Sequence, residues 1–403
     1  MDATDPHAVR RRQVFYIPGF DPFHPRRYRE LYRNQAAEQA RIAGYQISVS
    51  PKRGEGRYGW HIHAIQDGVR TETDMEVLIW SDIVRGSMKA SIPATYAQLL
   101  RTVWAYVGSG ALFRLMRLRR GPVLAALYPI VMLLVQAAIG LGLGVGLACA
   151  LPAFPHDGAV RLAIVAAVLV AALRLFRALD KRIFAYYLMH DYAFTARWKG
   201  AYPPELEARM ADFAGTIAAA LRAPCDEVLL IGHSSGAHLA ISILADLTRQ
   251  GRIPQEGPRM ALLTLGQVVP MVSFLPGARR LRADLAWLST REEIFWLDVT
   301  APGDPCSFAL CDPVAVSGVA PPDQRWPLVI SAAFRRSLSP ERRKRLRGRF
   351  FRLHFQYLCA FDNPANYDYF RITAGPVTLA SRYQGRAPSP SRITRAAQHP
   401  ADA

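Results

Sequence analysis

Ser234 lies in a Gly-x-Ser-x-Gly pattern whose surroundings suit nucleophilic chemistry. A short apolar run ends at Gly232, and apolar side chains at helical spacing follow Gly236. This pattern predicts a nucleophile elbow, where the serine occupies a strained strand-to-helix turn and the flanking glycines allow close backbone approach. The amino end of the following helix would direct N–H groups, including that of Ser235, toward a developing oxyanion.

Two further residues could activate this serine. Asp304 follows an apolar run in a Pro-Gly-Asp-Pro turn, and His354 ends another apolar stretch that we interpret as a strand. A histidine can take the serine proton, and an acid can hold the imidazole in the required tautomer. Asp298 stays open as the alternative acid, although it lies inside its apolar run and not in the turn.

The other histidines fit the role of base less well than His354. His233 and His238 flank the serine too closely in sequence to reach back to it, and His399 lies in a polar tail. His61 and His63 alternate along one predicted strand, but we expect no carboxylate or cysteine partner near them. The sequence therefore predicts no metal site and no cofactor.

The chain order Ser234, Asp304, His354 resembles that of the α/β-hydrolase superfamily, of the serine esterase or lipase type. The resemblance covers roughly residues 10–100 and 185–380, and the elbow is its most specific motif. It implies a mostly parallel sheet with helices on both faces. It also implies an enzyme that cleaves an acyl ester through a covalent serine intermediate.

The resemblance also implies a second oxyanion donor after the first strand. An apolar run at 13–17 leads into Pro18-Gly19-Phe20, and the N–H of Phe20 occupies the donor position. Pro18 stands where many superfamily members have histidine, which leaves the N–H geometry unchanged. A thioesterase or amidase with the same residues, and a non-catalytic scaffold that tethers a partner to a membrane, remain the alternatives.

The middle of the chain contains two apolar segments that predict a transmembrane hairpin. Residues 123–151 carry no charge, and a helix of that length spans about 43 Å, more than a hydrocarbon core of about 30 Å. Residues 159–176 are interrupted near their ends by Arg161 and Arg174, so this segment could also be re-entrant or interfacial. An even number of crossings is needed to keep Phe20 and Ser234 on one side.

The flanks of this hairpin are basic on both sides. The positive-inside rule therefore predicts a multi-pass protein of the cytoplasmic membrane whose catalytic part faces the cytoplasm. The basic residues are Arg114, Arg117, Arg119 and Arg120 before the hairpin, and Arg174, Arg177, Lys181 and Arg182 after it. Gly140, Gly142, Gly144 and Gly146 form two overlapping GxxxG spacings. We expect them to pack against the second segment, and a homodimer is the alternative.

Charge and composition agree with a membrane location. Together with the hairpin, the net charge of +18 favours anionic headgroups over nucleic acid as the polyanionic partner. The membrane location alone suggests a lipid as the acyl ester that is cleaved, and another acyl ester is the alternative. Five cysteines without zinc spacing indicate a reducing compartment. The expected organisation is a first core part at 1–110, a hairpin insertion at 111–182, a second core part at 183–384 and a disordered tail at 385–403.

Overall fold

The computed structural model describes residues 8–52, 56–152 and 157–397. Eight strands form one sheet in the order β2-β3-β4-β1-β5-β6-β7-β8. The six strands from β4 to β8 are parallel, and β2 and β3 join antiparallel at one edge. The strands are β1 (Arg11–Ile17), β2 (Gln46–Pro51), β3 (Gly59–Gln66), β4 (Val69–Val77), β5 (Glu227–His233), β6 (Arg259–Leu265), β7 (Ile294–Thr300) and β8 (Leu328–Ser331).

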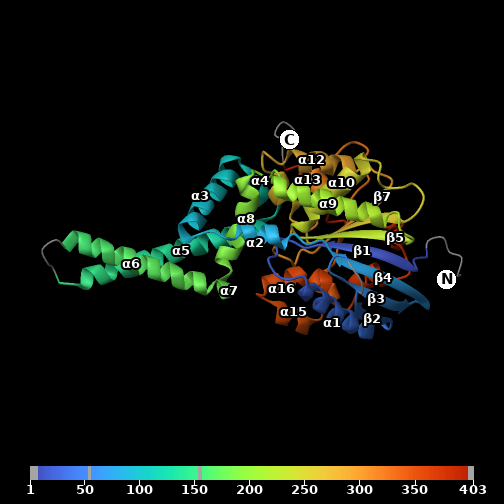
Figure 1. Cartoon of the computed structure of the whole chain (residues 1–403), viewed down its shortest axis with the longest axis horizontal. Helices are drawn as coiled ribbons and strands as arrows, with labels where there is room; N and C mark the ends of the chain where they lie inside the picture. Colours follow the sequence, from blue (N-terminus) through green and yellow to red (C-terminus); the bar gives the residue numbers. More distant parts are fainter. Residues whose placement is uncertain (1–7, 53–55, 153–156, 398–403) are drawn as a thin grey trace.

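Helices cover both faces of this sheet (Figure 1). One face packs against α1 (Arg26–Ala43), α15 (Pro340–Leu346), α16 (Phe350–His354) and α17 (Tyr369–Ala374), and the other against α9 (Pro204–Ala220), α10 (Gly236–Arg249) and α12 (Arg279–Leu288). β5 is buried along its whole length, as expected for a central parallel strand with both faces covered. The expected α/β architecture with a mostly parallel sheet is confirmed.

The strand order changes direction at β1. This strand lies between β4 and β5, so the chain builds one half of the sheet before it returns to build the other. Open α/β sheets bind ligands at such a position, outside the carboxyl ends of the two adjacent strands. The loops that follow β1 and β5 therefore meet where a ligand site is expected.

The long connection between β4 and β5 carries both apolar segments. It consists of α2 (Ser81–Ser87), α3 (Ile92–Gly108), α4 (Ala111–Leu118), α5 (Arg120–Ala150), α6 (Asp157–Ala178), α7 (Asp180–Ile183), α8 (Ala185–Arg197) and α9. The antiparallel pair α5 and α6 projects from the body of the protein (Figure 1). Both helices are long and apolar enough to cross a membrane, and the apolar window of α6 has no buried residue.

The GxxxG residues in α5 divide into two faces. A Cβ at Gly140 would lie 2.9 Å from Leu169 Cδ1, and one at Gly144 would lie 2.9 Å from Val165 Cα, both in α6. A Cβ at Gly142 or Gly146 would contact nothing. Packing of α5 against α6 therefore accounts for Gly140 and Gly144, whereas a homodimer through the other face stays a prediction.

Several local expectations are wrong. His354 ends a short helix and not a strand. β8 was not expected. The tail is ordered through residue 397, because the Ser389 N–H donates to Val329 O at 2.9 Å and Ile393 N–H donates to Leu310 O at 2.8 Å. Backbone pairing with the body therefore holds a segment whose composition alone predicts disorder.

The remaining helices are short connections. They are α11 (Val269–Ser273), α13 (Pro313–Val316), α14 (Phe334–Ser337), α18 (Leu379–Arg382) and a 3-10 turn at Phe355–Leu358.

Candidate active site

Ser234 occupies the sharp turn between β5 and α10. Its φ of 57° lies in the left-handed region, which a residue with a side chain adopts at a cost in strain. A Cβ at Gly232 would lie 2.6 Å from Ala237 Cα, and one at Gly236 would lie 2.2 Å from Ile17 O. Neither distance is tolerable, so glycine is required at 232 for close approach to the start of α10 and at 236 for the turn to close against β1. The strand-turn-helix expected around Ser234 is present.

Two backbone N–H groups beside Ser234 have no acceptor in the described part of the chain. They belong to Phe20 and Ser235, the two residues expected to donate to an oxyanion. The carbonyls of the Phe20 loop are fixed, because Trp80 Nε1 donates to Pro18 O at 2.9 Å and Tyr187 OH donates to Phe20 O at 2.5 Å. These bonds hold the loop while leaving its N–H groups available.

His354 contacts Asp304 directly. Its Nδ1 lies 2.8 Å from Asp304 Oδ2, and both side chains are buried. A carboxylate can only accept here, so Nδ1 carries the proton and Nε2 is left with its lone pair. Asp304 follows β7 and His354 ends α16, and the sheet brings them together across 50 residues.

The surroundings keep Asp304 ionised. Burial pushes the pKa of Asp304 upward, but the charge and hydrogen bond of His354 and the Cys306 N–H at 2.9 Å outweigh it, so the pKa is lowered. Tyr357 OH adds a 3.0 Å bond to Asp304 Oδ2. The sequence does not predict this role of Tyr357, since nothing in its local pattern indicates that the chain folds back onto Asp304.

Asp298, the alternative acid, faces a different partner. Its Oδ1 accepts from Thr264 Oγ1 at 2.6 Å inside the sheet. Burial raises the pKa of Asp298 to about 8, which opposes a role as a carboxylate that stabilises an imidazolium. The geometry therefore pairs His354 with Asp304.

The other histidines near Ser234 are neutral and serve the structure. His233 Nε2 donates to His354 O at 3.1 Å, and burial followed by the charge of His354 lowers the pKa of His233 to about 3. Burial likewise lowers the pKa of His238 to about 3, and Tyr202 OH lies 3.2 Å from its Nδ1. His399 lies outside the described residues.

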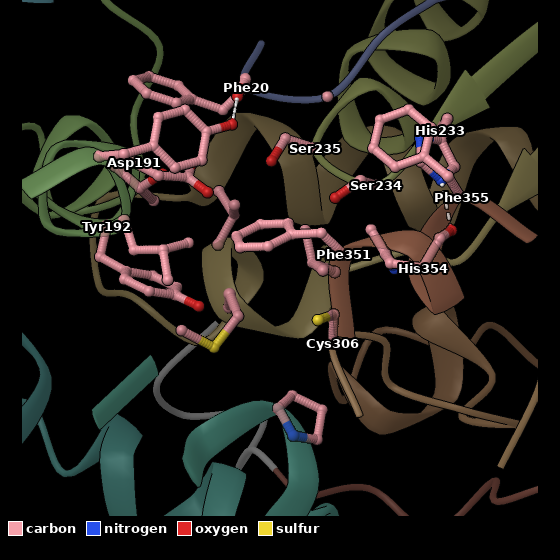
Figure 2. Close-up of a pocket in the computed structure, with 18 of the residues that line it drawn as sticks. Phe20, Asp191, Tyr192, His233, Ser234, Ser235, Cys306, Phe351, His354 and Phe355 are labelled. Atoms are coloured by element: carbon pink, nitrogen blue, oxygen red, sulfur yellow. Dashed lines mark hydrogen bonds between the residues drawn. The ribbon is translucent and has the colours of Figure 1, made fainter. Parts of the chain in front are cut away.

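Ser234 and His354 line the same pocket with Ser235 and Phe20 (Figure 2). Among the described residues, no hydrogen bond joins the Ser234 hydroxyl to the His354 ring. Such bonds are often long in a site without substrate and tighten when substrate binds. The structure thus brings together the residues expected from the sequence, with one contact still to form.

The opposite wall of this pocket comes from the segment inserted between β4 and β5, which the sequence predicts only as a membrane anchor. It contributes Tyr106 of α3, Pro122 of α5, and Tyr187, Leu188, Asp191, Tyr192 and Thr195 of α8. The α8 residues recur at steps of three and four, which places them on one helix face. That spacing is a signal the sequence carries, although core packing would explain it equally well.

One group of side chains has the composition of a metal site. Asp304, Cys306 and His354 offer donor atoms that all lie within 4.8 Å of one another. However, His354 Nδ1 is already bonded to Asp304, and burial raises the pKa of the Cys306 thiol, which disfavours the thiolate that metals bind. The arrangement suits proton transfer better than metal binding.

The expectation for the histidines of β3 is wrong in one respect. Carboxylates do lie beside them, because His61 Nδ1 is 2.9 Å from Asp74 Oδ1 and His63 Nδ1 is 3.8 Å from Glu72 Oε1. Each pair joins neighbouring strands β3 and β4 in register. The two cross-strand pairs lie side by side, because the rings of His61 and His63 have centroids 4.4 Å apart.

Comparison with models of protein families, with curated proteins and with solved structures found no significant match to the chain.

Proposed function

We propose that the protein is a serine hydrolase that cleaves an acyl ester, with Ser234 as nucleophile. The observation that carries this proposal is the combination of a left-handed serine between two obligatory glycines with His354, which lines the same pocket and bonds to Asp304 at 2.8 Å. The nucleophile and its base come from separate elements, and this combination is typical of acyl-transfer enzymes.

The mechanism follows from the positions of the protons. His354 Nε2 takes the Ser234 hydroxyl proton as Oγ attacks the ester carbonyl, and Asp304 stabilises the resulting imidazolium. The N–H groups of Phe20 and Ser235 receive the oxyanion, a contribution of about 3 kcal/mol per donor. His354 then protonates the leaving alcohol, and water attacks the acyl-serine with His354 again as base.

The fold proposed for this enzyme is that of the α/β-hydrolases. The parallel sheet, the strand order and the chain order of Ser234, Asp304 and His354 support it. The departure from a plain member is the β4–β5 connection, which supplies both the hairpin and one wall of the pocket.

The proposed location is the membrane, with α5 and α6 as a spanning hairpin. The exposed apolar surface continues beyond the hairpin, because Leu100 and Trp104 of α3 are 69% and 77% exposed. α3 lies at the end of the body from which the hairpin projects (Figure 1). Tyr96 OH of α3 also donates to Leu133 O of α5 at 2.8 Å. An apolar, Trp-bearing surface at this position suits the interface of a bilayer.

A lipid substrate is proposed because the hairpin and the pocket are adjoining parts of the structure. Pro122, which begins the apolar part of α5, lines the pocket, and a Cβ at Gly121 would lie 3.4 Å from Pro305 O beside Asp304. An ester entering from the bilayer would therefore reach Ser234 without crossing the body of the protein. The basic flanks favour a surface of anionic headgroups.

A serine-directed probe tests the proposed enzyme. A fluorophosphonate should label the wild-type protein and fail to label Ser234→Ala, while Ser235→Ala stays labelled. Labelling lost only in Ser235→Ala would move the nucleophile by one residue. Absence of labelling in folded wild-type protein would reject the hydrolase and favour a non-catalytic scaffold. Parallel ester, thioester and amide substrates separate the reaction classes.

Cysteine accessibility tests the topology. Single cysteines at Leu118, His156 and Phe184, in an otherwise cysteine-free background, are treated with an impermeant thiol reagent on intact cells. His156 lies outside the described residues, in the connection between α5 and α6. Only position 156 should react from outside. Reaction at 184 without 118 would mean a single crossing and reject the shared site, and protection of all three would reject the spanning hairpin.

A further inference from the structure

The pocket contains a carboxyl group, that of Asp191, which the proposed mechanism does not use. This residue is an acid on α8, and no donor in the described part of the chain bonds to its carboxyl group. Figure 2 shows Asp191 on the opposite side of the pocket from His354, with Ser234 and Ser235 between them. A carboxyl group held in a pocket without a protein partner is available to a ligand.

Aromatic rings dominate the remaining walls. They come from four regions of the chain and are Phe20, Tyr106, Tyr187, Tyr192, Phe351 and Phe355. Ring faces attract cations, and the attraction increases when the cation is removed from water. An acid among such rings is a chemical environment suited to an organic ammonium group.

The charge distribution points the same way. The chain has 50 lysines and arginines, yet none lines this pocket among the described residues. His233, which also lines the pocket, is kept neutral because burial lowers its pKa to about 3. The protein is strongly basic, yet the pocket that holds Ser234 and His354 is lined by an acid and, among the described residues, by no lysine or arginine.

We propose, resting on the proposed hydrolase function, that the pocket selects acyl esters whose alcohol portion carries an ammonium group. Asp191 is the anionic contact, and the rings of Tyr106, Tyr187 and Tyr192 from the inserted helices enclose the cation on the side away from His354. The acyl carbonyl then lies at Ser234 between the N–H groups of Phe20 and Ser235. Membrane lipids with amino-alcohol headgroups and free amino-alcohol esters share this chemistry.

The protonation of Asp191 gives this selection a pH dependence. Burial raises the pKa of Asp191 to about 7, and the charge of His354 opposes the rise. The other titratable groups around it are Cys306, Tyr106, Tyr187 and Tyr192, whose burial-raised pKa values keep them neutral at this pH. A bound ammonium favours the carboxylate, so cation selection should strengthen as pH rises through about 7.

The test compares two esters of equal shape. A choline ester and the 3,3-dimethylbutyl ester of the same short acid differ in the charge of one atom. Wild-type kcat/KM should favour the choline ester by about tenfold or more, the scale of a desolvated cation contact. Asp191→Asn, which keeps the size of the side chain, should lower that preference about tenfold. Glu205→Gln, an exposed acid at the start of α9, is the matched control.

The same pair of esters provides a readout that a merely structural role of Asp191 would not change. The ratio of the two kcat/KM values removes any effect that is common to both esters, should rise through about pH 7 in wild type, and should be flat in Asp191→Asn. A ratio near one in wild type, or a preference unchanged in Asp191→Asn, would overturn the inference while the serine probe still labels Ser234.

Binding measurements separate this inference from the hydrolase proposal. Calorimetric titration with choline should detect binding to the wild type that is weakened about tenfold in Asp191→Asn, whether or not any ester is cleaved. Hydrolysis of phosphatidylcholine vesicles is then compared with hydrolysis of phosphatidylglycerol vesicles. Faster hydrolysis of phosphatidylcholine indicates a lipid substrate, because only a lipid substrate makes vesicle hydrolysis depend on the choline headgroup. Equal choline binding by both proteins, or none, rejects the cation site.

Discussion

The two walls of the pocket were built in different ways. The wall with Ser234 and His354 comes from the turn after β5 and from α16, with Asp304 after β7 bonded to His354, and the facing wall comes from helices inserted between β4 and β5. On the first wall, backbone geometry positions the reacting groups; on the second, helix packing positions a ring-lined surface with one acid. The first wall suits chemistry common to many substrates, and the second suits selection among them.

The largest expected effect falls on the sheet wall. His354→Ala should lower kcat by about three orders of magnitude or more, and Asp304→Asn somewhat less, because the wrong imidazole tautomer is then favoured. Steady-state hydrolysis of a soluble ester measures both. If Asp304→Asn retains nearly full activity while Asp298→Asn abolishes it in a folded protein, the His354–Asp304 contact at 2.8 Å is not the functional one.

The second largest effect is expected at Gly236, where the backbone of the elbow approaches that of β1. A Cβ at Gly236 would lie 2.2 Å from Ile17 O and 2.7 Å from Pro18 O, so Gly236→Ala must displace β1 or the elbow. We expect a loss of about 2 kcal/mol or more, the scale of overpacking a rigid site, together with loss of probe labelling. Gly142→Ala, a helical glycine with open space around it, should leave thermal unfolding nearly unchanged. Equal stability of the two variants would show that the elbow is not constrained as the structure indicates.

The difference between the walls also explains how much the sequence could predict. Ser234, its glycines and the strand before it form one local pattern, so the elbow could be found without knowing the fold. Asp304 and His354 could be found because each closes an apolar stretch in a known chain order, although the helix at His354 was taken for a strand. Local turn chemistry carries most of this information.

The helical wall could not be predicted in the same way. Asp191 and Tyr187 face the pocket only because α8 packs against α3 and α5, contacts between segments more than 30 residues apart. Their helical spacing is compatible with an ordinary core face, so sequence alone could not separate the two. Tyr357 is a similar case, since its bond to Asp304 depends on where the chain returns after β8.

A hydrogen bond between the two walls predicts an intermediate effect. Tyr187 of α8 donates to Phe20 O at 2.5 Å and so fixes the loop whose N–H faces the pocket. Tyr187→Phe should lower kcat about tenfold with little change in KM, because the bond positions an oxyanion donor that acts mainly in the transition state. Kinetics with the neutral ester measure it, and Tyr128→Phe, which loses a bond to Ile183 O away from the pocket, is the control. A change confined to KM would mean that Tyr187 acts on binding alone.

The smallest effect on activity is expected for Asp298, and its signature is in stability. Both Asp298 in the sheet and Asp191 in the helical wall have raised pKa values because of burial, but only Asp298 has a protein partner, Thr264. The folded pKa of Asp298 is about 8 against 3.8 for the unfolded group, so the folded protein retains a proton that the unfolded chain releases. Its contribution to stability is therefore fully present below about pH 4 and is lost as pH rises toward 8.

Asp298→Asn keeps an acceptor for Thr264 and cannot titrate. The Tm of the variant relative to wild type should thus increase steadily between these pH values while ester hydrolysis stays within about twofold. A Tm difference that is constant with pH would mean that Asp298 ionises normally. Burial would then not disfavour Asp298 as the acid beside His354.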